Sequence, residues 1–98
     1  MVIKEVLSKV ETSQNPVAKA LHTGKEFRAL VIAFKEAMIL KDHKTNRPAK
    51  LTVLQGGVTY EQGERIEVLG THDTVDIPVG IMHRVVANED ALCILTQG

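Results

Sequence analysis

The stretch Ile77-Pro78-Val79-Gly80-Ile81-Met82-His83 decides the fold, because it joins two runs of residues that favour β-strands. Proline restricts the backbone and removes a hydrogen-bond donor, whereas glycine tolerates positive φ, so Pro-x-Gly predicts a tight corner that starts a new strand. Side chains alternate along a strand, so we expect Ile81, His83 and Val85 to share one face. A histidine among aliphatic side chains on such a face is a candidate site residue.

Further β-favouring runs lie on both sides of this corner, with turn signals between them. We expect short strands at residues 17–21, 27–34, 37–40, 51–54, 58–60, 66–69, 74–77, 83–87 and 91–96. Strands of this length at regular spacing are typical of an all-β sandwich or barrel. Residues 2–11 differ, because their apolar residues have helical spacing, which predicts a short helix or extended arm that must dock on something.

Composition excludes several classes of protein. The 98 residues include twelve acidic and twelve basic residues, so no net charge attracts nucleic acid or an anionic membrane. Three aromatic residues are too few for a platform that stacks bases. The chain has no apolar run of membrane-spanning length and no N-terminal signal-peptide pattern, which predicts a cytoplasmic protein. The single cysteine, Cys93, excludes an intrachain disulfide and lies in an apolar run that predicts a buried strand.

Two stretches resemble the conserved motifs of the cupins. Gly70, Asp73 and residues 78–83, followed by Asn88, are similar to the second cupin motif, and residues 43–56 are similar to the first. The resemblance covers about residues 27–96. It implies a double-stranded β-helix, or jelly-roll barrel, with a site in its mouth. We therefore expect a single cupin-like domain over residues 1–98, with an N-terminal arm and edge strand in 1–25 and the barrel in 26–98.

The first motif departs from the family at the positions that hold metal. The resemblance implies four ligands, namely two histidines and a glutamate from the first motif and one histidine from the second. The matching positions here are His43, Thr45, Ala49 or its neighbour Lys50, and His83. A divalent iron, manganese, nickel or zinc centre normally needs three or four protein donors. The sequence therefore predicts no tightly bound metal, with His43 and His83 as the ligands if a metal does bind.

A concave barrel mouth is a common place for a ligand, so we expect a small molecule to bind there. The expected ligand-binding residues are His43, Thr45, Lys50, His83 and Met38. One alternative is a metal-dependent dioxygenase or isomerase that uses the two histidines, and another is a non-catalytic sensor or interaction domain in which these histidines lie too far apart to share a ligand. The sequence leaves enzymatic activity open and assigns no catalytic residue.

The remaining expectations concern the surface of the protein. His22 and His72 have no spacing partners and are expected to be exposed. A small barrel has exposed edge strands, and the N-terminal segment is long enough to cover an edge of a neighbouring subunit. We therefore expect a homodimer that binds neither nucleic acid nor membrane.

Overall fold

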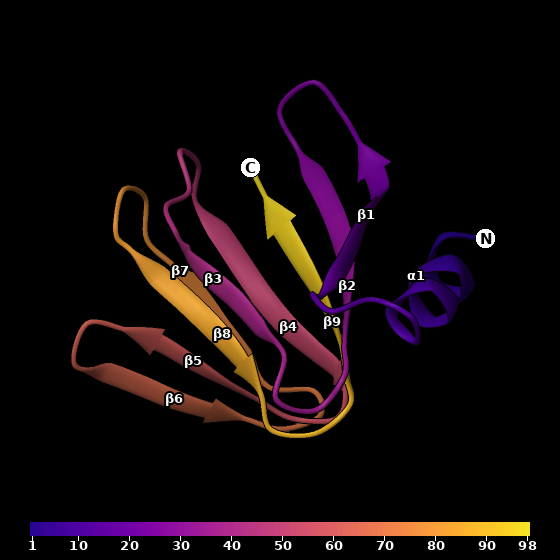
Figure 1. Ribbon diagram of the computed structural model, residues 1–98. Coiled ribbons are helices and arrows are strands. Elements are labelled where there is room, and N and C mark those ends of the chain that lie inside the picture. The colour runs from indigo at the N-terminus through magenta and orange to yellow at the C-terminus, as the bar shows by residue number, and fades with distance from the viewer.

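Nine strands and one helix make up the computed structural model, which describes residues 1–98 (Figure 1). The elements are α1 (Val2–Val10), β1 (Val17–Thr23), β2 (Arg28–Phe34), β3 (Ile39–His43), β4 (Ala49–Gln55), β5 (Val58–Gln62), β6 (Arg65–Leu69), β7 (Thr74–Ile77), β8 (His83–Ala87) and β9 (Ala91–Gln97). All strand pairs are antiparallel, in one sheet of order β1-β2-β9-β4-β7 and another of order β3-β8-β5-β6. The expected all-β jelly-roll barrel is confirmed.

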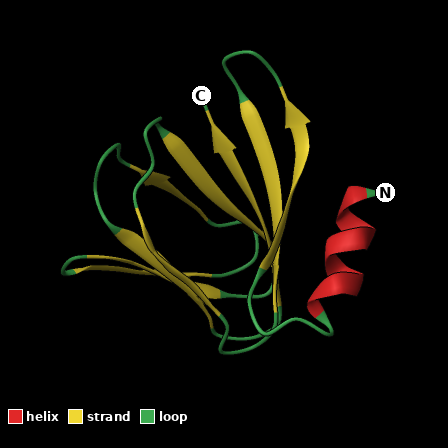
Figure 2. Cartoon of the chain, turned by 45° about the horizontal axis from the view of Figure 1, so that its top comes forward, coloured by secondary structure: helices red, strands yellow, loops and turns green.

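The two sheets face each other and enclose one apolar core. They lie close together at one end and splay apart at the other (Figures 1 and 2). We call the first the closed end, where residues 35–38, 56–57 and 88–90 connect the strands, and the second the open end, where residues 24–27, 44–48 and 78–82 do so. Fifteen buried residues from both sheets form the core, and Tyr60 and Phe34 have its largest fully buried side chains.

Alternation of side chains decides which residues face the core. In β4, Ala49, Leu51 and Val53 are buried between exposed or half-buried neighbours. In β8, His83, Val85 and Ala87 are buried in the same way. Strand β2 instead is buried on both faces from Val31 to Phe34, which explains its continuous apolar sequence.

Helix α1 covers the outer face of the first sheet (Figure 2). Val6 and Val10 are buried against Val31, Ala33 and Leu92. The expected docking segment is thus a helix, and it packs on the sheet of its own chain. The predicted homodimer therefore depends on the exposed sheet edges alone and stays a prediction, which light scattering at micromolar concentration tests. The helix has nine residues, and no helix in the chain is long and apolar enough to cross a membrane.

Candidate functional site

Two histidines meet at the open end of the barrel. His43 ends β3 and pairs in register with His83, the first residue of β8, and the ring centroids are 4.1 Å apart. The register shifts by one residue between Leu40 and His43. Without this bulge, simple alternation would place Asp42 opposite His83, so the extra residue turns His43 toward the core face in its place.

Each imidazole is held by a backbone carbonyl of its own strand or loop. Nδ1 of His43 donates to the Lys41 carbonyl at 2.8 Å, and Nδ1 of His83 donates to the Ile81 carbonyl at 3.3 Å. A carbonyl only accepts, so the neutral form of either ring carries its proton on Nδ1 and keeps a lone pair on Nε2. No buried side-chain nitrogen or oxygen in the chain lacks a partner, and Nε2 of His83 has no protein partner, so this atom reaches the solvent.

The environment of His83 favours its neutral form. The residue is only 4% exposed. Burial, followed by the nearby His43, lowers the pKa of His83, although its carbonyl partner and the Asp42 charge oppose this shift. The neutral form is therefore favoured at pH 7, and in this form Nε2 can accept a hydrogen bond.

Tyr60 supports the histidine pair from the next strand. Its ring stacks on His83 with centroids 5.7 Å apart and an interplanar angle of 27°. The phenol donates to Oε1 of Gln62 at 2.7 Å, and burial raises the pKa of Tyr60. Tyr60 was not among the expected site residues, although its inward position in β5, next to β8, follows from strand alternation.

Thr45 lies at the open end as expected, but its hydroxyl has structural partners. The residue is 6% exposed. Oγ1 donates to the Arg47 carbonyl at 2.7 Å and accepts from Nε2 of Gln97 at 3.4 Å. Thr45 therefore shapes the loop between β3 and β4, and we do not assign it a direct ligand contact.

The structure separates Lys50 from the histidines. Leu51 and Val53 face the core, so alternation turns Lys50 to the outer face, where its ammonium lies 3.4 Å from the Asp76 carboxylate. Inward placement of Lys50 is thus wrong, and the inward position in the first motif belongs to Ala49.

Met38 and Ile81 also lie apart from the pair. Met38 precedes β3 at the closed end, where its sulfur accepts from the Lys35 amide at 3.3 Å. It packs against both the barrel core and the apolar cluster beneath helix α1, so it is a core residue and not part of the barrel mouth. Ile81 precedes β8 and is 45% exposed, so the expected shared face holds for His83 and Val85 only.

The histidine pair does not form a complete metal site. The chain has no group of three or more His, Cys, Asp or Glu side chains placed to hold a metal ion. The positions that supply further donors in the cupin pattern carry Thr45, committed to its loop, and Ala49, which has no donor. Two imidazoles fall short of the three or four donors that a divalent ion normally needs. The residues present therefore do not fit a tightly held resident metal.

The other candidate groups lie away from this site. His22 and His72 are exposed, and His72 has a φ of 74° in the turn before β7. Cys93 is fully buried in β9, and burial raises the pKa of its thiol to about 12. These placements agree with the expected surface positions of both histidines and with a thiol that packs as an apolar side chain.

Two arginines at the open end were also missed by the sequence reasoning. Arg28 begins β2 and Arg47 follows β3, and both line one polar cavity with Gln97. The two arginines are nineteen positions apart in the sequence, so no local motif indicates that they share a cavity. Only the pairing of strands brings them together.

Comparisons with known proteins support the fold. No protein-family model and no curated protein matches the sequence. A cupin superfamily protein from Desulfitobacterium hafniense aligns with a TM-score of 0.81 and 14% identity, over 92% of this chain and 84% of that one. An RmlC-like cupin from Shewanella frigidimarina aligns with a TM-score of 0.80 and 20% identity, over 88% and 78%.

A third solved structure has the same architecture and assigns no activity to this chain. KdgF from Halomonas aligns with a TM-score of 0.77 and 24% identity, over 88% of this chain and 81% of that one. Identities in this range show shared architecture and leave ligand and chemistry open, because one fold supports many functions. With its two facing sheets and paired motifs, the chain therefore has the fold of the small cupins.

Proposed function

We propose that the open end of the barrel binds a small molecule that donates a hydrogen bond to the histidine pair. The observation that carries the proposal is the 4.1 Å contact between the His43 and His83 rings. Both rings are fixed through Nδ1, which leaves Nε2 as the acceptor that a ligand hydroxyl or amide would use.

Burial of His83 adds weight to this proposal. The residue is almost fully buried, yet its Nε2 reaches the solvent, so the hydrogen-bond donor of a ligand can approach this atom. Here only Nδ1 has a protein partner. The close contact also disfavours the sensor alternative in its expected form, since that alternative required histidines too far apart to share a ligand.

The enzyme alternative has less support. A metal-dependent mechanism needs donors that the pair does not provide. A neutral imidazole can act as a general base, but the structure presents no second group in a defined catalytic role beside it. Ligand binding is therefore the function that the geometry supports best.

Histidine-ring NMR tests the proposal, because the four histidines give separate signals. The probe is N,N-dimethyl-4-hydroxyphenylacetamide, whose only hydrogen-bond donor is its hydroxyl, and the corresponding 4-methoxy compound, which has no donor, is its matched control. We expect the hydroxyl compound to shift the ring signals of His43 and His83 and to leave those of His22 and His72 in place. Equal shifts with both compounds, or shifts confined to His22 and His72, would contradict the proposal.

A further inference from the structure

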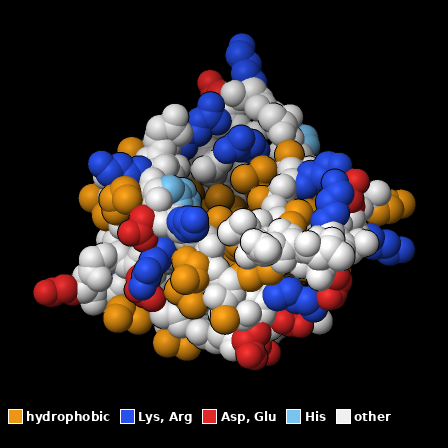
Figure 3. Space-filling model, viewed as in Figure 1, with side chains coloured by type: hydrophobic (Ala, Val, Ile, Leu, Met, Phe, Trp, Pro, Cys, Tyr) orange, Lys and Arg blue, Asp and Glu red, His pale blue; other side chains and the backbone are white.

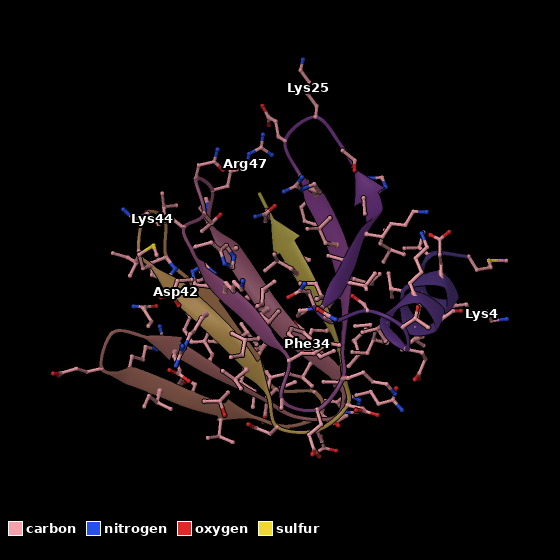
Figure 4. All side chains as sticks on the ribbon, in the orientation of Figure 1. Lys4, Lys25, Phe34, Asp42, Lys44 and Arg47 are labelled. Carbon is pink, nitrogen blue, oxygen red and sulfur yellow. The ribbon has the colours of Figure 1, made fainter.

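A polar cavity of about 300 Å³ lies at the open end, next to the loop that follows His43. Its lining residues come from four separate segments and none is hydrophobic: Thr23, Gly24, Arg28, Asn46, Arg47 and Gln97. Figure 3 shows a different hollow, which has apolar side chains deep inside it and a histidine side chain at its margin, with Lys and Arg side chains gathered beside it. Figure 4 places Arg47 at this end of the barrel, far from Phe34 in the core.

The two arginines of this cavity are the ones that have no carboxylate partner. The chain has four arginines, of which Arg65 and Arg84 lie 4.0 and 3.1 Å from glutamate oxygens. Arg28 and Arg47 form no ion pair, and no acidic residue lines the cavity. Two positive charges thus share one concave surface without compensation inside it.

Neutral groups hold this surface in place. Nε and Nη2 of Arg28 donate to Oε1 of Gln97 at 3.1 and 2.6 Å, and Nε2 of Gln97 donates to Oγ1 of Thr45 at 3.4 Å. The amide oxygen carries no charge, so it orients the guanidinium without neutralising it. A guanidinium has five N–H donors, and the other three remain available. Thr45 links the network to the Arg47 backbone and thus to the histidine-bearing strand.

From this arrangement we propose that the cavity binds the carboxylate of a small organic molecule whose other end reaches the histidine pair. The inference rests on the proposed function, since it names the chemical class of that ligand. A guanidinium matches a carboxylate with two parallel hydrogen bonds, which a neutral amide or an apolar group cannot replace. His43 and Arg47 are four residues apart, so their Cα atoms lie at most about 14 Å apart and a small molecule can span them.

Calorimetric titration compares 4-hydroxyphenylacetate with the neutral 4-hydroxyphenylacetamide. We expect the acid to bind at least about ten times more tightly, as is usual for hydrogen bonds to a charged group. Because both arginines are exposed, binding of the acid should weaken as salt is added, whereas binding of the amide should not. Equal affinity for acid and amide, no detectable binding of the acid at millimolar concentration, or binding of inorganic phosphate in its place overturns the proposal.

Substitutions of single residues then test which arginines bind the carboxylate. Arg28→Gln and Arg47→Gln should each weaken binding of the acid about tenfold and leave the amide unaffected. The matched control is Lys19→Gln, which removes a cation of the edge strand β1 that pairs with Glu5 and should bind as the wild type does. Arg47→Lys keeps the positive charge but loses the planar guanidinium that makes two parallel hydrogen bonds, so an intermediate affinity is expected. Thermal melts confirm that each variant is folded, and wild-type affinity in both glutamine variants overturns the proposal.

The two proposals fail in different ways. Suppose that the acid and the amide both shift the ring signals of His43 and His83, while the arginine variants bind the acid as the wild type does. The histidine site is then supported and the carboxylate site is wrong. If the acid binds through the arginines without moving either ring, the carboxylate contact stands, but the span to the histidines and the proposed function are wrong.

Discussion

The two ends of the barrel are built from the same strands but from different chemistry. Strand β8 runs through both, with Val85 and Ala87 toward the closed end and His83 at the open end. At the closed end the turns are tight and the charge of Lys35 is paired with Glu11 and Asp90, whereas at the open end Arg28 and Arg47 have no carboxylate partner. The contrast indicates that the closed end supplies stability and that the open end is free to bind, so changes at the two ends should have different consequences.

Two glycines with positive φ offer the strongest test of this contrast. At the closed end Gly56 has a φ of +86°, and a Cβ there would lie 2.2 Å from the Asp90 carbonyl oxygen. At the open end Gly80 has a φ of +74°, and a Cβ would meet nothing within 4 Å. We expect Gly56→Ala to reduce the free energy of unfolding by roughly 3–5 kcal/mol, from strain plus overlap, and Gly80→Ala by roughly 1–2 kcal/mol, from strain alone. Urea denaturation measures both, and similar losses would contradict the proposed difference.

Replacing His83 by phenylalanine should separate stability from binding. Phenylalanine keeps a planar ring, although a somewhat larger one, and no buried polar partner is orphaned, so the free energy of unfolding should fall by no more than about 3 kcal/mol. Binding of 4-hydroxyphenylacetamide should be lost, because the Nε2 acceptor is gone. Circular dichroism and calorimetry measure the two effects. A variant that unfolds, or one that still binds, would show that His83 is a structural residue.

The sequence predicted most of the strands, because their limits are local. Pro78 and Gly80 define the corner before β8, and Gly56 ends β4, as the turn residues indicated. The inner and outer faces of β8 also followed from alternation. For these features the physical cause lies within a few neighbouring residues.

The site was less predictable, because its causes are not local. Because of the bulge in β3, His43 lies at the inner face where regular alternation would place Asp42. No residue type in that stretch predicts the bulge. The resemblance left Ala49 and Lys50 as alternatives for one position, whereas alternation with Leu51 would have placed Lys50 outside. The approach of Arg47 to its cavity depends on how distant strands pair.

The buried His83 should also make the free energy of unfolding depend on pH. His83 has a lowered pKa because it is buried and then because His43 lies beside it, whereas the unfolded chain has the ordinary value near 6.5. Between these two values the unfolded state binds more protons, so the free energy of unfolding falls as the pH falls through that window. The full contribution of His83 is present above about pH 6.5.

Urea denaturation at a series of pH values between about 7.5 and 5 isolates this effect. We expect the wild type to lose more stability over that range than His83→Phe does. The exposed His22 supplies the control, since His22→Gln should behave as the wild type. Identical pH profiles for the wild type and His83→Phe would mean that the imidazole is not buried in the folded protein.

Metal ions should have the smallest effect. Two imidazoles without a third side-chain donor give only weak binding. Stoichiometric iron(II), manganese, nickel or zinc should therefore raise Tm by no more than about 1 °C in a thermal melt. A rise of several degrees that disappears in His43→Gln would show that the pair holds a metal with donors from solvent.

The central claim is that the open end is the binding surface and the closed end is not. The most direct test is a titration with 4-hydroxyphenylacetate followed by the backbone amide signals in ¹H–¹⁵N spectra. We predict shifts concentrated in residues 23–28, 43–47, 80–84 and 96–98, and none in residues 55–58 and 87–91. Shifts that centre on the closed end, or that spread evenly over the outer faces of the sheets, would contradict the account.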